Sequence, residues 1–374
     1  MRPKTFHTKS RSWGGPDFLI LAPLFLLLVF GMIALSSASS NLGQKNFNDS
    51  YYYLKHQLLY GAAIGMLGLL AAYVIPYHRY ERISLAALIL SFFLLILVFT
   101  PIGFSAGGAS RWLQFGEITI QPAEILKITL VLYLAAWLSK QKERRKHAVR
   151  GLIPFLTILL IIALLLVKQP ATSTLAILLF VAGAMYFASG APWKYIILLG
   201  IIAVLGIALL IYFTPYRLER FLTFLDPEAD PRSAGYQLYQ TLLSVGSGGL
   251  TGVGYGESVA KAYYLPEPIG DSIFAVIAAE FGFLGSLLLI IAFGTLVFRA
   301  LVISRRCDDS FGKLILLGFG TLIGIQTFVN IAAVSGLIPL TGTPLPFISY
   351  GSSGLIAYMI IAGILLNVSR YARK

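Results

Sequence analysis

An aspartate at the edge of an apolar segment is the residue of this chain that most suggests chemistry. Asp271 ends the polar bend YYLPEPIGD and is followed by SIFAV, which begins a long apolar run. A carboxylate in this place could cap a helix by accepting backbone N–H bonds, or it could serve as a general base. The residues alone leave both roles open. Glu267, four residues earlier in the same bend, is a second candidate acid.

Three more charged residues lie where a membrane would disfavour them. Glu124 and Lys127 are three apart in the apolar run 121–139, on one face of a predicted helix. A single charge at the centre of a bilayer costs about 2.5–3.5 kcal/mol on insertion scales, so this pair predicts either an internal salt bridge or a polar binding site. Arg111, followed by Trp112, suits a diphosphate through its planar fork of donors, although it could also reach lipid headgroups.

Glycine and proline mark two further polar segments, GSGGLTGVGYGES (246–258) and GLIPLTGTPLPFISYGSSG (336–354). Glycine lets the backbone approach a partner closely, and proline fixes φ and removes a donor. Because irregular backbone at membrane depth survives only inside protein or beside a wet cavity, the second segment predicts a rigid re-entrant loop. The alternative is a tight connection between two helices. Ser349 and Tyr350, in the same segment, are candidate substrate contacts.

The composition places these residues in a membrane protein. Of 374 residues, 57% are hydrophobic and 12% are charged, whereas soluble domains carry about a quarter charged residues. Apolar runs of about 18 residues or more predict transmembrane helices. We therefore predict an all-α polytopic membrane protein that forms one domain over residues 1–374. The predicted helices cover residues 17–37, 52–76, 83–102, 121–139, 151–167, 172–189, 193–213, 271–298, 314–335 and 352–369.

The basic residues predict the orientation of these ten helices. Most of the 29 Lys and Arg fall in the N-terminal segment, in alternate loops and at the C-terminus, and positive charge stays cytoplasmic. Both termini are therefore expected inside, and the long loop 214–270 between the seventh and eighth helices is expected outside. The net charge of +13 then reflects topology and contact with anionic membrane lipid rather than nucleic-acid binding.

Other chemistries lack support in the sequence. Cys307 is the only cysteine, and the four histidines show no metal-ligand spacing. There is no GxxxxGK[ST] loop and no GxGxxG between a strand and a helix, so nucleotide hydrolysis is not expected. No internal repeat indicates an inverted-repeat transporter. A divalent cation, Mg or Mn, is the one cofactor that a diphosphate substrate could bring, and no metal ligands are assigned.

These motifs in this order resemble the SEDS family (shape, elongation, division and sporulation) of polytopic peptidoglycan glycosyltransferases. The resemblance rests on RWLQFG, IQPAEILK, GSGGLTGVG, YLPEPIGDSIFAV and GLIPLTGTPLPFISYG. FLDPEADPRSAGYQLYQ (224–240) is more similar to the division members than to the elongation members. Two departures stand out: Ile269-Gly270 replace the usual His-Thr before the aspartate, and Ala171 replaces an acid after Gln-Pro.

The resemblance implies polymerisation of lipid II on the outer face of the cytoplasmic membrane, at the division septum. It assigns the essential aspartate to Asp271 and the family's Arg, Glu and Lys positions to Arg111, Glu124 and Lys127. It also implies a class B penicillin-binding protein (an FtsI-like transpeptidase) and other division proteins as partners. The competing hypotheses are a lipid II flippase, an elongation polymerase and a scaffold that only recruits division proteins.

One carboxylate is enough for this chemistry. Glycosidases need two carboxylates because one must protonate a poor leaving group. Undecaprenyl pyrophosphate is already stable as an anion, so nearby cations can replace the acid. A single base must still take the proton from the attacking sugar hydroxyl, and direct displacement inverts the anomeric centre.

Overall fold

The computed structural model describes residues 15–106, 109–115, 118–140, 148–226, 234–259, 261 and 264–372. In this part of the chain, nine helical segments have the length and apolar composition of membrane spans, and a shorter apolar helix lies at the sixth predicted span. The helical membrane fold predicted from the sequence is confirmed. The helices are α1 (Phe18–Phe47), α2 (Tyr52–His56), η1 (Gln57–Ala63), α3 (Ile64–Val74), α4 (His78–Leu97), α5 (Pro122–Lys140), η3 (Ala148–Leu152), α6 (Ile153–Lys168), α7 (Thr172–Ala188), α8 (Trp193–Tyr212), α9 (Pro215–Leu225), α10 (Ala234–Ser247), α12 (Ile273–Arg306), α13 (Ser310–Val334) and α14 (Ser352–Ser369).

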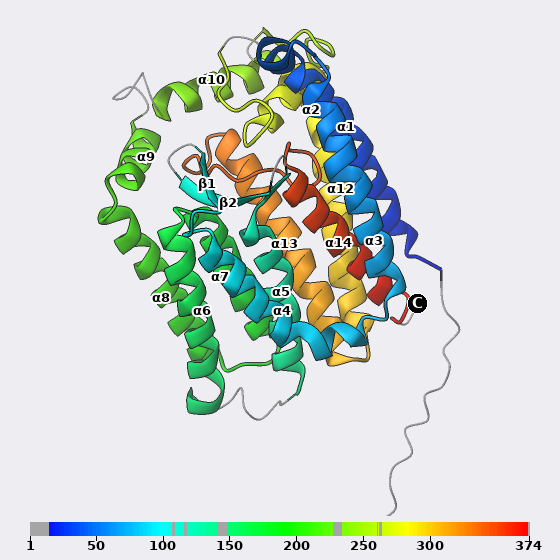
Figure 1. The fold of residues 1–374 in the computed structure, drawn as a ribbon, viewed down its shortest axis with the longest axis vertical. Helices are drawn as coiled ribbons and strands as arrows, with labels where there is room; N and C mark the ends of the chain where they lie inside the picture. The colour runs from blue at the N-terminus through cyan, green and yellow to red at the C-terminus, as the bar shows by residue number, and fades with distance from the viewer. Residues whose placement is uncertain are drawn as a thin grey trace, which may run out of the picture.

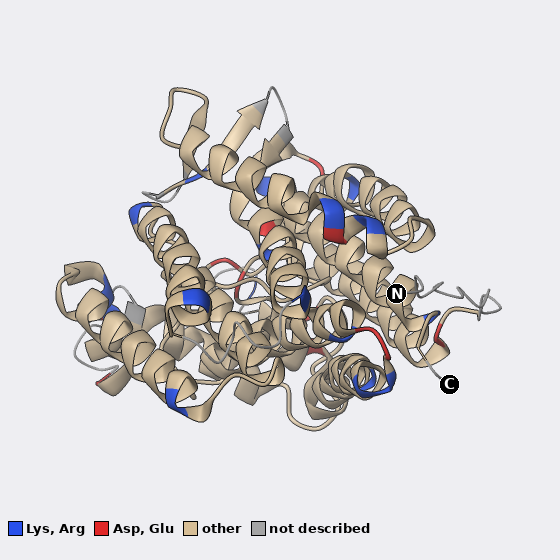
Figure 2. Cartoon of the chain, turned by 90° about the horizontal axis from the view of Figure 1, so that it is seen from below, with Lys and Arg blue, Asp and Glu red and all other residues tan. Residues whose placement is uncertain are grey.

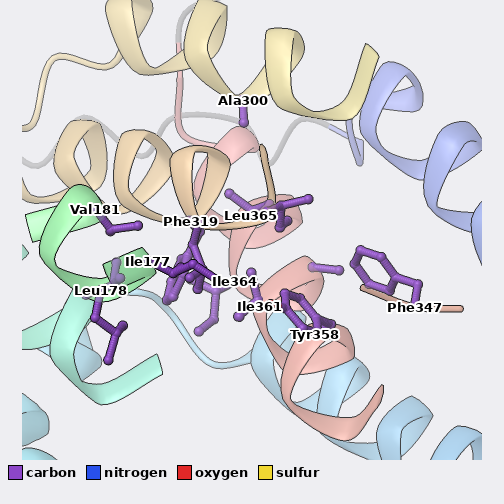
Figure 3. Close-up of a cluster of buried hydrophobic side chains, with 14 of the residues drawn as sticks. Ile177, Leu178, Val181, Ala300, Phe319, Phe347, Tyr358, Ile361, Ile364 and Leu365 are labelled. Atoms are coloured by element: carbon purple, nitrogen blue, oxygen red, sulfur yellow. The ribbon is translucent and has the colours of Figure 1, made fainter. Parts of the chain in front are cut away.

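The interior of the bundle is formed by α5, α7, α13 and α14. Phe319 of α13 packs among Ile177 and Leu178 of α7 and Ile361 and Ile364 of α14, and all five side chains are buried (Figure 3). At the opposite extreme, α8 has no buried residue and lies at the edge of the bundle, beside α6 and α7 (Figure 1). The charged residues are sparse, and most of the chain is free of them (Figure 2).

A small antiparallel sheet between α4 and α5 departs from the expected all-α chain. Its strands are β1 (Gly103–Ala106), β2 (Ala109–Phe115) and β3 (Ile118–Ile120), paired in that order. The strands are too short to show a clear alternation of apolar and polar residues, so the sequence indicates only a polar cluster here. Leu113 of β2 is buried and pairs with Ile120. Residues 107–108 and 116–117 of this cluster lie outside the described residues.

The segments predicted to be external gather at one end of the bundle. The sheet, α9, α10 and the start of α12 lie in the upper half of Figure 1, and the C-terminal end of α14 lies in the lower half. At that lower end Asp17 caps α1 and forms an ion pair of 2.8 Å with Arg299. We call the end that carries the sheet the outer end, after the predicted topology; which side of the membrane it faces stays a prediction. The basic N-terminal residues 1–14, the basic run 141–147 and residues 227–233 lie outside the described residues.

The glycine-rich segment of the long loop inserts against a break in α12. Gly282 has φ 65° and ψ −163° within this helix. The backbone N–H of Val253 donates to Ala279 O at 2.9 Å, and that of Phe283 donates to Gly249 O at 2.9 Å. At Gly252, with φ +86°, a Cβ would stand 2.0 Å from Glu280 O. Glycine is therefore required there for close backbone approach, and this part of the loop is anchored to the bundle.

A buried ion pair fastens the same loop at Lys261. Its Nζ bonds Glu280 of α12 and Ser37 of α1, the latter at 2.6 Å. Ser37 Oγ also lies 2.7 Å from both carboxylate oxygens of Glu280. The side chains of Lys261 and Glu280 are 3% and 0% exposed. The sequence analysis did not single out either residue.

We expect Lys261→Met to destabilise the protein. Removing one partner of a buried ion pair leaves an uncompensated charge and costs about 3–5 kcal/mol. Thermal denaturation of the full chain in detergent should show a clearly lower midpoint. Lys55→Met is the matched control, because Lys55 pairs with Asp49 at an exposed site and its loss should change the midpoint little. The double variant Lys261→Met/Glu280→Gln should recover part of the loss; equal midpoints for Lys261→Met and wild type would contradict this interpretation.

Candidate active site

Asp271 lies in a turn just before α12, not at the first helical residue as predicted. The helix begins at Ile273 with Ser272 at the N-cap position. The turn is closed by Glu267 O, which accepts from the N–H of Gly270 at 3.0 Å and of Ser272 at 3.3 Å. Hydrogen bonds between main-chain groups alone thus hold the backbone on both sides of Asp271.

The loop 335–351, between α13 and α14, holds this turn from the other side. Ser349 Oγ donates to Gly270 O at 2.7 Å, and the N–H of Tyr350 donates to Ile269 O at 2.8 Å. Ser349 Oγ also accepts from the N–H of Leu345 at 2.8 Å. Both candidate contacts from this loop therefore position the turn that carries Asp271. Their predicted role in touching substrate stays a prediction.

Two amide side chains of α13 anchor the loop inside the bundle. Gln326 Nε2 donates to Pro344 O at 2.9 Å, and Asn330 Nδ2 donates to Thr343 O at 2.7 Å and to Asp271 O at 2.8 Å. Gln326 lies eight residues before the end of α13, which corresponds to about 12 Å of helix. The loop therefore dips into the bundle, as the re-entrant interpretation predicted.

The Asp271 carboxyl is placed to act as a base near neutral pH. Burial, and then the negative charge of Glu267, raise its pKa, whereas Arg220 lowers it, and the net pKa is about 6. Its Oδ1 is buried without a hydrogen-bond partner among the described residues. The carboxyl lines a small pocket with Asn330 and residues 340–343. A raised carboxyl pKa with this cause is typical of functional sites.

Two arginines supply positive charge to the site: Arg220 lies near the Asp271 carboxyl, and Arg111 lies near Arg220. A Cβ at Gly342 would stand 3.7 Å from Asp271 Oδ2 and 3.9 Å from Arg220 Nη1, so both groups flank this glycine. Burial lowers the pKa of Arg111, and the positive charge of Arg220 adds to that effect while Tyr216 opposes it. Arg111 Nε donates to Gln169 O at 3.1 Å, and its Nη2 donates to Pro170 O. Two neighbouring guanidinium groups at the outer end suit an anion with more than one charge.

The pair Glu124–Lys127 lies inside the protein and away from this pocket. Lys127 Nζ is 2.6 Å from Glu124 Oε1 and 3.0 Å from Gln326 Oε1, and Lys127 and Glu124 are 2% and 4% exposed. Gln326 in turn bonds the re-entrant loop and accepts from Tyr358 OH. The internal salt bridge left open by the sequence is thus present. In this structure the pair acts on the site through Gln326.

The other predicted residues lie around the outer end in different surroundings. Glu267 is exposed and has φ 49°. Trp112 is half-buried in β2, opposite Phe104 of β1. Tyr350 OH is 3.1 Å from His56 Nδ1, and burial raises its pKa to about 12. The structure brings Glu267, Asp271 and the Ser349-Tyr350 backbone together. Trp112 is placed beside Arg111 on the sheet.

Comparison with known proteins decides the family. The family described as FTSW_RODA_SPOVE, cell cycle protein, matches residues 17–374. The chain belongs to this family. With its nine span-length apolar helices in the described residues, this chain is a multi-pass membrane protein.

Relatives and solved structures of the FtsW/RodA/SpoVE family cover nearly the whole chain. The probable peptidoglycan glycosyltransferase FtsW of Geobacter sp. (strain M18) is 39% identical and covers 96% of this chain and 98% of its own. Stage V sporulation protein E of Bacillus subtilis (strain 168) is 37% identical with the same coverage. A chain from a structure described as "structural coordination of polymerization and crosslinking by a peptidoglycan synthase complex" aligns with a TM-score of 0.79 at 27% identity, covering 96% of this chain and 98% of that one. The crystal structure of RodA from Thermus thermophilus aligns with a TM-score of 0.71 at 25% identity, covering 97% and 99%.

The two departures from the family's usual sequence lie in or directly beside residues whose main-chain carbonyl oxygens accept hydrogen bonds in the site. Ile269 and Gly270 offer their carbonyl oxygens to Tyr350 and Ser349, and these contacts need no particular side chain. Gln169 and Pro170, directly before the departure at Ala171, likewise accept hydrogen bonds from Arg111 through their carbonyl oxygens. The site of this family member therefore keeps its frame without the usual His-Thr pair or the acid at position 171.

Arg220, Gln326 and Asn330 were missed from the sequence. Gln326 and Asn330 are four apart on an apolar helix, which places them on one face, and isolated polar residues in membrane helices are usually functional. Their spacing is therefore the signal in the sequence that points to these two residues. Arg220 lies on the short amphipathic helix α9, and nothing in the sequence indicates which outer-loop arginine turns toward Asp271.

The described residues fit a divalent cation only in part. Within them, no group of three or more His, Cys, Asp or Glu side chains is placed to hold a metal ion. Asp271 and Glu267 offer two carboxylates, and Mg²⁺ is often bound by one or two carboxylates together with substrate phosphates. A cation would therefore be held mainly by a diphosphate substrate, whose charge it would partly neutralise.

The Asp271 titration can be tested directly. Infrared difference spectra of wild type against Asp271→Asn should show a carboxyl that titrates near pH 6. Glu267→Gln removes a negative neighbour and should lower this midpoint, whereas Arg220→Gln removes a positive neighbour and should raise it. A midpoint near the ordinary value in all three proteins would contradict the buried carboxyl seen here.

Proposed function

We propose that this chain polymerises lipid II into glycan strands on the outer face of the cytoplasmic membrane during septal wall synthesis, with Asp271 as the general base. The observation that carries the proposal is the buried carboxyl of Asp271, which lacks a partner on Oδ1 and lies beside Arg220 at the outer end of the bundle. The peptidoglycan glycosyltransferase names of its relatives support this reaction class.

The proposed step balances with one base and two cations. The 4-hydroxyl oxygen of the acceptor GlcNAc attacks the anomeric carbon of the donor, and Asp271 takes the hydroxyl proton. The bond from that carbon to the diphosphate breaks, and its electron pair leaves on undecaprenyl pyrophosphate. Arg111 and Arg220 offset the charge that develops on the leaving group. Asp271 then returns the proton to solvent.

Each remaining site residue supports this arrangement. Glu267 helps to keep the pKa of Asp271 high enough for base catalysis. Glu124 and Lys127 hold Gln326, and through it the re-entrant loop. Ser349 and Tyr350 fix the turn before Asp271. Trp112 offers a half-buried aromatic surface beside Arg111 for the lipid-linked sugar.

Replacement of Asp271 is the decisive test of the reaction. Asp271→Asn keeps the size of the side chain but removes the base, so polymerisation of fluorescent lipid II should fall by about 10²–10⁴-fold. Glu267→Gln is the comparison, since it removes an acid of the same turn and lowers the pKa of Asp271 but leaves the base in place, so its rate should fall far less than that of Asp271→Asn. Wild-type rates from Asp271→Asn would exclude the assignment. A lipid II flipping assay on the same samples separates polymerisation from transport.

We also propose a class B penicillin-binding protein as the transpeptidase partner, with lipid II and other division proteins at the septum. The similarity to a chain of a peptidoglycan synthase complex that polymerises and crosslinks supports such a pairing. A partner that binds the long loop could act on the site, because Lys261 of this loop is bonded to Glu280 of α12, and α12 begins two residues after Asp271. Co-purified transpeptidase should therefore raise the polymerisation rate. Equal rates with and without it would count against regulation by a partner.

A further inference from the structure

Asn330 leaves a buried oxygen without a donor beside the catalytic carboxyl. This side chain is 2% exposed and lines the same small pocket as Asp271. Asn330 Oδ1 and Asp271 Oδ1 are both buried and have no hydrogen-bond partner among the described residues. Buried polar atoms are almost always paired, so two unpaired acceptors in one pocket indicate a place for a ligand that brings donors.

The orientation of the Asn330 amide is fixed by its surroundings. Its Nδ2 donates to Asp271 O and to Thr343 O, and both of these partners are acceptors only. Turning the amide over would set Oδ1 against two carbonyl oxygens, so the atom left over must be the acceptor. The hydroxyls of Thr341 and Thr343, which line the same pocket, are 2.9 Å apart and bond to each other.

We propose that Asn330 Oδ1 accepts a hydrogen bond from the 3-hydroxyl of the acceptor GlcNAc while Asp271 takes the proton of the neighbouring 4-hydroxyl. This inference rests on the proposed lipid II polymerisation. Two acceptors in one pocket need two donors, and hydroxyls on adjacent carbons of one sugar ring supply them together. Asn330 is then both a sugar-binding residue, through Oδ1, and a positioning residue, through the bonds from Nδ2 to the backbone.

The pairing predicts a selectivity that a purely structural asparagine would not produce. Sites built to bond a substrate hydroxyl reject analogues that lack it, because their own polar group is then left unpaired. An asparagine that only braced the loop, with a water on Oδ1, would treat both kinds of acceptor alike. The 3-hydroxyl of the acceptor sugar is therefore the group to remove.

The test compares natural lipid II with lipid II whose GlcNAc lacks the 3-hydroxyl, each as acceptor for a labelled natural donor. Wild-type protein should extend the 3-deoxy acceptor at least about tenfold more slowly, and in Asn330→Ala the two rates should lie within about twofold of each other. Because both rates are measured on one preparation, their ratio does not depend on the fraction of folded protein.

Asn330→Asp is the matched control. It keeps an oxygen acceptor but removes the two amide donors, so it should be slower on both acceptors yet still prefer the natural one. Equal rates for both acceptors in wild type, or a full wild-type preference in Asn330→Ala, would overturn the proposal. If Asn330→Ala does not fold, as judged by thermal denaturation, the wild-type ratio alone decides. Failure of the proposed function looks different, since wild type would then not extend natural lipid II at all.

Discussion

Backbone that leaves regular helix inside a membrane must find its hydrogen-bond partners in the protein itself. The loop between α13 and α14 meets this demand through Gln326 and Asn330, whose amides bond three carbonyl oxygens of the loop and of the turn that carries Asp271. Those bonds allow the loop to enter the bundle, and the loop in turn holds the main chain before Asp271. The place and the burial of the carboxyl both depend on this constraint.

Two buried ion pairs, Glu124–Lys127 and Lys261–Glu280, also hold the segments around the site. Lys127 reaches Gln326 from α5, and Lys261 reaches Glu280 from the long loop. Burying such pairs carries a desolvation cost, so their value lies in fixing one arrangement of outer segments. The cations nearer the pocket, Arg111 and Arg220, have no carboxylate bonded to them among the described contacts. They remain in position for a charged ligand.

The sequence is informative where a residue type is energetically costly in a membrane or restricts the backbone. Long apolar runs predicted the helices, the three prolines of 336–354 predicted the re-entrant loop, and a carboxylate beside an apolar run pointed to Asp271. What it could not give depends on contacts across the bundle. The three short strands, the break at Gly282 and the approach of Arg220 arise from packing between segments far apart in the chain. Glu280 and Lys261 are unremarkable in their own neighbourhoods, and only the fold pairs them.

The break at Gly282 divides α12 into a short outer helical part and a long inner one. The short outer part, 273–281, begins two residues after Asp271. The glycine-rich segment bonds to it at Ala279 and Glu280, and to the inner part at Phe283 and Leu284. The long inner part packs among other helices and carries Arg299, which forms an ion pair with Asp17 at the other end of the bundle. Because the glycine-rich segment is bonded on both sides of the break, a change in its position would reach the turn that holds Asp271 through the short outer part of the helix. Mechanical communication at this site would not require the bundle to move as a whole.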